Sequence, residues 1–222
     1  MILLSWSSGK DSAWTLHRLR STGAGDVAGL LTSINETAGR VSMHGVREEI
    51  VRAQAAAAGL PLFTIPLPWP CTNAIYEERL RAAVGRAVAG GFTHVAFGDL
   101  FLEDVRRYRE ERLAGTGLAP MFPLWGLPTT QLAREMIAGG LRARLSTLDP
   151  RVMPRTFIGA EFDERFLAAL PPAVDPCGEN GEFHTCVTDG PMFSTRVDVG
   201  RGAIVEREGF VYGDLRLTRS AD

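Results

Sequence analysis

The chain has 222 residues, of which 45% are hydrophobic and 23% charged, as is ordinary for a soluble globular protein. This length allows one large domain, or a core domain with a smaller appendage, and a hydrophobic core that needs no disulfide bonds. With a net charge of −2, the composition does not suggest a nucleic-acid-binding surface, so we expect no nucleic-acid partner.

Two sequence features bear on the cellular compartment. Three cysteines, Cys71, Cys177 and Cys186, form neither a disulfide framework nor a pair of zinc-binding CxxC motifs. The apolar start, residues 1–6, is too short for a signal peptide, and no stretch approaches the roughly 18 apolar residues that cross a bilayer. We therefore expect a cytoplasmic protein with no membrane partner.

The first half of the chain alternates short apolar runs with longer amphipathic stretches. In chain order we expect strand 2–6, helix 11–21 with Asp11 or Ser12 near its N-cap, strand 27–33, a helix with Val46, Ile50, Ala53 and Ala57 on its apolar face, strand 62–65, a helix with Tyr76, Leu80, Val84 and Ala87, and strand 93–97. This alternation predicts an α/β, Rossmann-like (HUP-type) fold with a parallel sheet of about five strands flanked by helices. Ligands bind such sheets outside the carboxyl ends of the strands, where the loops after Trp6 and Phe97 lie.

The sequence changes in character near residue 126. A helix is predicted over 129–138 and a strand over 143–148, and strand-like segments return at 194–199, 203–206 and 210–217. Between them, residues 150–192 are rich in Pro and Gly. We therefore predict two parts, an ATP-binding α/β domain over residues 1–125 and a smaller α+β substrate-binding region over residues 126–222.

Between the first strand and the first helix lies the segment Ser7-Ser8-Gly9-Lys10-Asp11-Ser12. Polyphosphate is bound by backbone N–H groups at a helix N-terminus and by hydroxyl donors, where no side chain blocks its approach. Gly9 permits that approach, the serines supply hydroxyls, Lys10 adds a positive charge, and Asp11 suits a phosphate if Mg²⁺ lies between them. The segment is not a Walker A loop, because Leu4 stands at the first Gly position and Asp11 follows Lys10 directly.

This segment resembles the phosphate loop of the PP-loop (N-type ATP pyrophosphatase) superfamily, Ser-Gly-Gly-Xaa-Asp-Ser, with Ser8 in place of the first Gly. Two further elements narrow the resemblance to the diphthine–ammonia ligase-like family. They are Gly98-Asp99 with Asp104, Arg107, Arg109, Glu111, Gly117-Leu118 and Pro123-Leu124-Trp125, and then Gly178-Glu179-Asn180-Gly181-Glu182-Phe183-His184-Thr185. The second is similar to the family's Glu-Gly-Gly-Glu-Phe-Glu-Thr element and departs from it at Asn180 and His184, while Ala114 replaces a frequent Cys. His44-Gly45 with Arg47 is closer to the family's bacterial branch.

The resemblance implies an ATP-dependent ligase that adenylates a carboxylate acceptor and amidates it with ammonia, releasing AMP and pyrophosphate. It implies a small-molecule or protein-borne acceptor, ammonia, ATP and Mg²⁺. The chain shows no glutaminase signature, so we expect free ammonia as the nitrogen donor, and a homodimer is left open. The implied site residues are Ser7, Ser8, Gly9, Lys10, Asp11, Ser12, Gly98 and Asp99 for ATP, Asp11 for the metal, Arg107, Arg109, Glu111, Glu179, Glu182 and Thr185 for the acceptor, and Lys10, Asp11, Arg107 and Glu182 for catalysis.

Several of these residues also fit structural roles. Arg107, Arg109 and Glu111 suit a solvated helix face, although two arginines at i and i+2 would act together more readily on an irregular segment. Glu179 and Glu182 flank Asn-Gly, which also fits a hairpin turn with exposed acids. The three candidate zinc ligands, Cys177, His184 and Cys186, lack the spacing of a closed site, and Trp69 and Trp125 are expected in the core or at a dimer contact.

Two other functions remain open on this fold. The first is a PP-loop enzyme that adenylates another small molecule or RNA; RNA-modifying members usually carry catalytic cysteines or an RNA-binding domain. The second is a non-catalytic ATP-binding sensor, which normally has a Gly-rich phosphate loop late in the chain, whereas here the loop lies at residues 7–12. ATP binding without turnover would favour the sensor.

Overall fold

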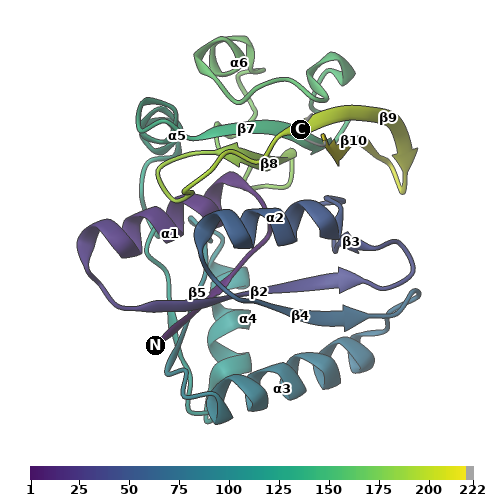
Figure 1. Cartoon of the computed structure of the whole chain (residues 1–222). Helices are drawn as coiled ribbons and strands as arrows, with labels where there is room; N and C mark the ends of the chain where they lie inside the picture. Colours follow the sequence, from purple (N-terminus) through teal and green to yellow (C-terminus); the bar gives the residue numbers. More distant parts are fainter. Residues whose placement is uncertain (219–222) are drawn as a thin grey trace.

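The computed structural model describes residues 1–218. Its elements are, in chain order, β1 (Ile2–Ser5), α1 (Lys10–Thr22), β2 (Val27–Asn35), β3 (Arg40–Val41), α2 (Glu48–Ala58), β4 (Leu62–Leu67), α3 (Asn73–Ala89), β5 (His94–Ala96), α4 (Glu103–Leu113), β6 (Ala119–Met121), α5 (Thr129–Ala138), β7 (Arg142–Leu148), the 3₁₀ turn η1 (Arg155–Phe157), α6 (Glu164–Ala169), β8 (Phe183–Asp189), β9 (Val199–Arg207) and β10 (Phe210–Leu217). Figure 1 shows two sheets in separate layers, with α1 and α2 between them and α3 and α4 on the far side of the first sheet.

The first sheet confirms the predicted α/β fold. Strands β4, β2, β1, β5 and β6 pair in that order and all run parallel, and β3 adds an antiparallel pair at the end of β2. Residues 2–4 of β1 are buried on both faces, as expected for a central parallel strand. The chain reverses its direction of travel across the sheet between β1 and β5, so the carboxyl ends of these two strands form the topological switch point.

The helix ends show where local capping signals are reliable. Gly23 and Gly59 end α1 and α2 in the left-handed conformation, with φ of 63° and 66°. Asp11 and Ser12 lie near the N-cap of α1, as predicted, and the N-cap itself is Gly9, which uses no side chain. The Asp11 carboxylate binds the Lys10 amine instead of a backbone N–H at the cap, and the Ser12 hydroxyl donates to the Gly9 carbonyl.

The second sheet is antiparallel, in the order β8-β7-β10-β9, and is flanked by α5, η1 and α6. The predicted helix over 129–138 is confirmed. Strand β8 was not predicted, and the strand predicted over 194–199 is wrong, since residues 194–198 lie outside any strand and Ser194 is tied to the carbonyl of Ala57 at the end of α2. The division at residue 125 stays a prediction.

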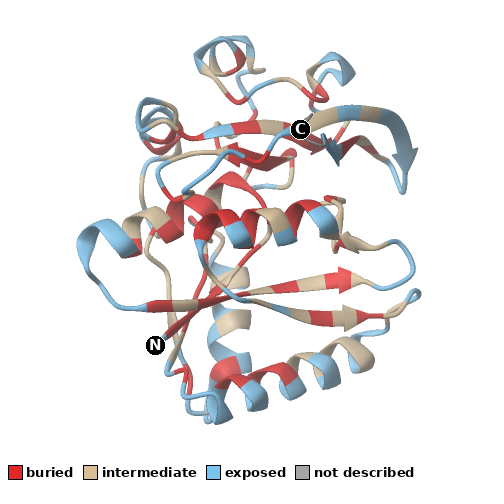
Figure 2. Ribbon diagram, in the orientation of Figure 1, coloured by how far each residue is buried: buried red, intermediate tan, exposed pale blue. Residues whose placement is uncertain are grey.

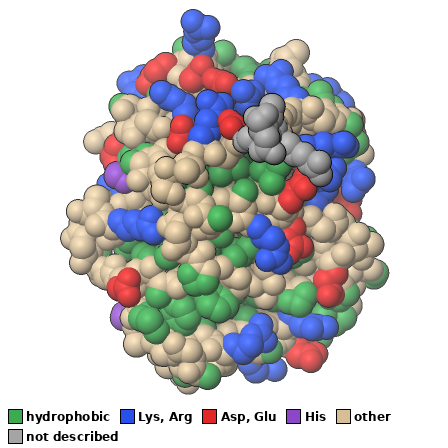
Figure 3. Space-filling model, viewed as in Figure 1, with side chains coloured by type: hydrophobic (Ala, Val, Ile, Leu, Met, Phe, Trp, Pro, Cys, Tyr) green, Lys and Arg blue, Asp and Glu red, His purple; other side chains and the backbone are tan. Residues whose placement is uncertain are grey.

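Burial is concentrated where the two layers meet, at α1, α2, β7 and β8 (Figure 2). Trp69 is 59% exposed, so it does not lie in the core, and the predicted alternative, a dimer contact, stays a prediction. On the face in Figure 3, basic and acidic side chains are interspersed. Within residues 1–218, no helix has both the length and the apolar character needed to cross a membrane.

Candidate functional site

The predicted phosphate loop lies at the carboxyl end of β1 and is held against the second sheet. Its backbone begins at Trp6, whose N–H donates to the Leu31 carbonyl over 2.7 Å. Ser8 is fully buried and has a φ of +72°, a region that favours glycine. Its carbonyl accepts hydrogen bonds from the Val187 N–H at 2.9 Å and from Gln54 Nε2 at 3.2 Å. Residues distant in sequence therefore fix the shape of this short loop.

Strand β8 packs directly over the first turn of α1. A Cβ at Gly9 would lie 3.3 Å from the Thr185 carbonyl oxygen and 3.5 Å from its Oγ1, so a glycine allows this approach. The Lys10 N–H donates to Thr185 Oγ1 over 3.0 Å. The next two N–H groups, those of Asp11 and Ser12, lie in the first turn of α1 and have no acceptor within the helix. Thr185 is only 2% exposed and anchors the loop, and its predicted place in an acceptor pocket stays a prediction.

Three buried side-chain atoms without a hydrogen-bond partner, the only ones within residues 1–218, mark this region. They are Ser8 Oγ, Asp11 Oδ1 and Thr32 Oγ1. Thr32 directly follows Leu31, whose carbonyl accepts the Trp6 N–H, so it too lies beside the start of the loop. Since buried polar groups are normally paired, this concentration indicates a site built to receive a polar ligand. Thr32 is not among the predicted site residues, because a single hydroxyl within an apolar strand is its only sequence feature that could indicate a ligand site.

The Lys10 side chain points into the interior and is 2% exposed. Its amine donates to Asp11 Oδ2 over 2.8 Å and to the Cys177 carbonyl, and lies 5.7 Å and 5.5 Å from the centres of the Phe162 and Phe183 rings. Burial alone would lower the pKa of Lys10, but Asp11 raises it above its ordinary value, so the amine stays charged. The Lys10 amine therefore orients the Asp11 carboxylate through Oδ2, while Asp11 Oδ1 has no hydrogen-bond partner.

Two other loops meet the phosphate loop at the switch point. Gly98, in the loop after β5, packs so tightly against α1 that a Cβ there would lie 2.9 Å from the Asp11 carbonyl carbon. The Glu179 carboxylate, from the loop before β8, accepts the Leu100 N–H over 2.7 Å. Burial raises the pKa of Glu179 to about 7; the Leu100 N–H opposes that rise and the charge of Asp11 adds to it. Glu179 is thus a carboxyl poised to change protonation near neutral pH beside the loop.

The predicted alternative of a hairpin with exposed acids at Glu179 and Glu182 is wrong. Glu182 is 7% exposed, and its carboxylate accepts hydrogen bonds of 3.0 Å from the Asp175 N–H, the Asn180 N–H and the Asn180 side chain. Asp175 in turn accepts the N–H groups of Cys177 and Glu179. Glu182 therefore shapes the loop that presents Glu179, and its carboxylate is occupied within that loop.

The structure does not bring Arg107, Arg109 and Glu111 together into one group. All three lie in the regular helix α4, not on an irregular segment, so the two arginines point in different directions. Arg109 reaches the site, where its Nε lies 3.3 Å from Asp99 Oδ2 and its guanidinium covers the Phe97 ring at 4.8 Å. Arg107 and Glu111 are exposed and make no ion pair within residues 1–218.

The cysteines and histidines near the loop are packed and uncharged. Burial raises the pKa of the Cys177 thiol well above its ordinary value and that of Cys186 to about 12, which disfavours a nucleophilic thiolate. The centres of the His44 and His184 rings lie 4.3 Å apart with the rings tilted by 36°, and burial lowers the pKa of His44 to about 4. No group of metal-ligating side chains with the geometry of a metal site occurs in the described part of the chain.

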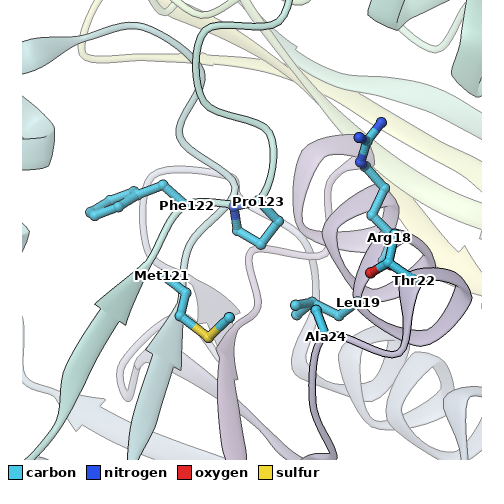
Figure 4. A pocket seen from close by; sticks show the side chains of 7 residues that line it. All are labelled: Arg18, Leu19, Thr22, Ala24, Met121, Phe122 and Pro123. Carbon is cyan, nitrogen blue, oxygen red and sulfur yellow. The ribbon is translucent and has the colours of Figure 1, made fainter.

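A separate groove lies along the C-terminal half of α1, away from the phosphate loop. Figure 4 shows Arg18 and Leu19 on one side and Met121, Phe122 and Pro123 on the other. The groove is open and lies at the opposite end of α1 from Asp11, so the candidate site rests on the loop rather than on this hollow.

Comparisons with known proteins agree with these motifs. A family model described as the diphthamide synthase C-terminal domain matches residues 128–219. The diphthine–ammonia ligase of Schizosaccharomyces pombe is 26% identical over 221 residues, covering 90% of this chain and 36% of the relative. The human diphthine–ammonia ligase is 27% identical over 124 residues, covering 53% of this chain and 46% of the relative. The chain thus spans between a third and a half of these curated relatives, and along most of its length it is similar to proteins named diphthine–ammonia ligase.

Proposed function

We propose that this chain binds Mg-ATP at its phosphate loop and uses it to adenylate a carboxylate acceptor, which ammonia then converts to an amide. The observation that carries the proposal is the set of unpartnered buried groups, Ser8 Oγ, Asp11 Oδ1 and Thr32 Oγ1, around the free N–H groups of the first turn of α1. The names of the two relatives, diphthine–ammonia ligase, support the class of reaction.

The chemistry explains why such a site is needed. A carboxylate becomes an acylating agent only when one of its oxygens gains a good leaving group. Its oxygen bonds to the α-phosphorus of ATP as the bond to pyrophosphate breaks; ammonia then bonds to the acyl carbon, AMP leaves, and a proton is lost. The first N–H groups of α1 and the loop hydroxyls bind the phosphates, and Asp11, with a free carboxylate oxygen, suits Mg²⁺.

Other residues take supporting roles in this proposal. Glu179 and Asp99 lie beside Asp11 at the switch point, where the acceptor must approach the α-phosphate. Glu182 and Thr185 position the two loops, and Lys10 orients Asp11. Arg109 is the arginine placed to bind an acidic group near Asp99, whereas Arg107 and Glu111 would act only on an acceptor that extends over α4.

The proposal is tested by ligand-dependent thermal unfolding. If Mg-ATP binds only the folded state, it must raise the melting temperature. At a ligand concentration of a hundred times Kd, binding adds about 2.7 kcal/mol to the free energy of unfolding. We expect this rise in wild type and a much smaller one in Asp11→Asn. Asp214→Asn is the matched control, because Asp214 lies on β10 of the second sheet and its carboxylate accepts hydrogen bonds from Arg40 and Arg47. No rise in wild type at millimolar Mg-ATP would refute the proposal, and binding without AMP formation from any acceptor would favour the sensor.

A further inference from the structure

Helix α2 carries a fully buried glutamine, Gln54, whose side chain joins three parts of the chain. Its Oε1 accepts the indole N–H of Trp6 over 3.0 Å, at the end of β1. Its Nε2 donates to the Val187 carbonyl of β8 over 2.7 Å and to the Ser8 carbonyl of the phosphate loop over 3.2 Å. Both ends of the amide are therefore used, and one of them holds the loop itself.

The hydrogen bond to Ser8 fixes the orientation of the next peptide group. In a trans peptide the carbonyl and the N–H that follows it point in opposite directions. Gln54 and the Val187 N–H both bind the Ser8 carbonyl on the side of β8, so the Gly9 N–H is turned to the other side, toward Ser7 Oγ at 3.3 Å. The φ of +72° at Ser8 belongs to this arrangement.

We propose that Gln54 is a positioning residue for the nucleotide phosphates: it holds the Ser8–Gly9 peptide so that the loop presents an N–H, and not a carbonyl oxygen, to ATP. A carbonyl turned toward the phosphates would repel them, whereas the N–H attracts them. Gln54 itself does not contact the nucleotide. This inference rests on the proposed function, since it assigns a purpose to the loop geometry only if ATP binds there.

The test uses Gln54→Glu with Trp6→Phe as a matched control. A glutamate keeps the oxygen that accepts the Trp6 indole N–H. It lacks the NH₂ group that donates to the Ser8 and Val187 carbonyls, so the hydrogen bonding that holds the Ser8 carbonyl weakens. Trp6→Phe removes the other hydrogen bond of Gln54 and leaves Ser8 held. We expect calorimetric titration with Mg-ATP, below the unfolding transition of each protein, to give about tenfold weaker binding for Gln54→Glu, equal to about 1.4 kcal/mol, and less than about threefold for Trp6→Phe.

If both variants bind ATP as wild type does, or if both lose affinity equally, the positioning role is overturned. If Gln54→Glu does not fold, Trp6→Phe/Gln54→Met compared with Trp6→Phe alone makes the same test without leaving an unpaired indole N–H. If wild type binds no ATP, the proposed function fails, and the hydrogen-exchange rate of the Gly9 amide decides separately whether Gln54 holds the Ser8–Gly9 peptide. Faster exchange in Gln54→Glu than in Trp6→Phe supports the hold on the peptide, and equal exchange overturns it.

Discussion

Ser8 is the residue at which the loop geometry makes its sharpest prediction. It has a φ of +72° and is fully buried, and its hydroxyl has no partner in the described part of the chain. The PP-loop signature has glycine at this position. We therefore expect Ser8→Gly to stabilise the protein while removing a hydroxyl that the proposed function assigns to ATP.

The size of the effect follows from three terms. A non-glycine residue in the left-handed region costs about 1–2 kcal/mol, and a buried hydroxyl without a partner costs about 1–3 kcal/mol. Against these, glycine adds entropy to the unfolded chain worth about 0.5–1 kcal/mol. We expect a net gain of about 1–4 kcal/mol in the free energy of unfolding. For a chain of this size, each kcal/mol raises Tm by about 2–4 °C.

Urea denaturation of wild type, Ser8→Gly and Ser8→Ala measures these terms separately, provided the slope of the free energy with urea is unchanged. Ser8→Ala removes the hydroxyl but keeps a side chain at positive φ, so it should be less stable than Ser8→Gly by about 1 kcal/mol. A Ser8→Gly protein that is less stable than wild type, or equal in stability to Ser8→Ala, would refute the reasoning about backbone strain.

Three further predictions follow from the site and its supports. Folding raises the pKa of Glu179 from 4.5 to about 7, so the stability that Glu179 contributes is complete below pH 4.5 and is lost as pH rises through 7. We expect Glu179→Gln to reduce this decline in the free energy of unfolding by up to about 3 kcal/mol, as measured by urea denaturation from pH 4.5 to 8. Parallel pH curves for the two proteins would contradict the prediction. Gly98→Ala places a Cβ against the Asp11 backbone and should cost about 1–3 kcal/mol, whereas Gly85→Ala, in open space on α3, should gain about 0.5–1 kcal/mol; equal denaturation midpoints would be inconsistent with the close approach. Although burial opposes it, hydrogen bonds from arginines hold the pKa of Asp214 well below its ordinary value, so Asp214→Asn should cost about 2–4 kcal/mol at pH 7, and thermal melts should show the difference narrowing below pH 4 rather than staying constant.

The parallel sheet could be predicted because its signals are local. The apolar run of β1, the helical spacing of α3 and the left-handed glycines after α1 and α2 each lie within a few neighbouring residues. Strand β8 could not be predicted in this way. It is the edge strand of the second sheet that faces the phosphate loop, and its residues are buried on both faces, so the polar side chains of His184 and Thr185 break any two-residue alternation.

The candidate site divides along the same line. The phosphate loop is contiguous in sequence and follows a strand, which makes it recognisable from its residues alone. Gln54 is the buried polar residue of the alanine-rich helix α2, and its importance depends on partners 46 to 133 residues away. Proximity in sequence could not predict how Arg107 and Arg109 differ, because the regular helix α4 directs only Arg109 toward Asp99.

The most direct test of the account is the identity of the phosphate products formed from ATP. Wild type, Asp11→Asn and Asp214→Asn would be incubated with Mg-ATP, an ammonium salt and a carboxylate-rich metabolite extract, with extract-free controls, and followed by ³¹P NMR. The account predicts AMP and pyrophosphate from wild type and Asp214→Asn, dependent on the extract, and a large loss in Asp11→Asn. Formation of ADP and inorganic phosphate, or turnover that does not depend on Asp11, would contradict it.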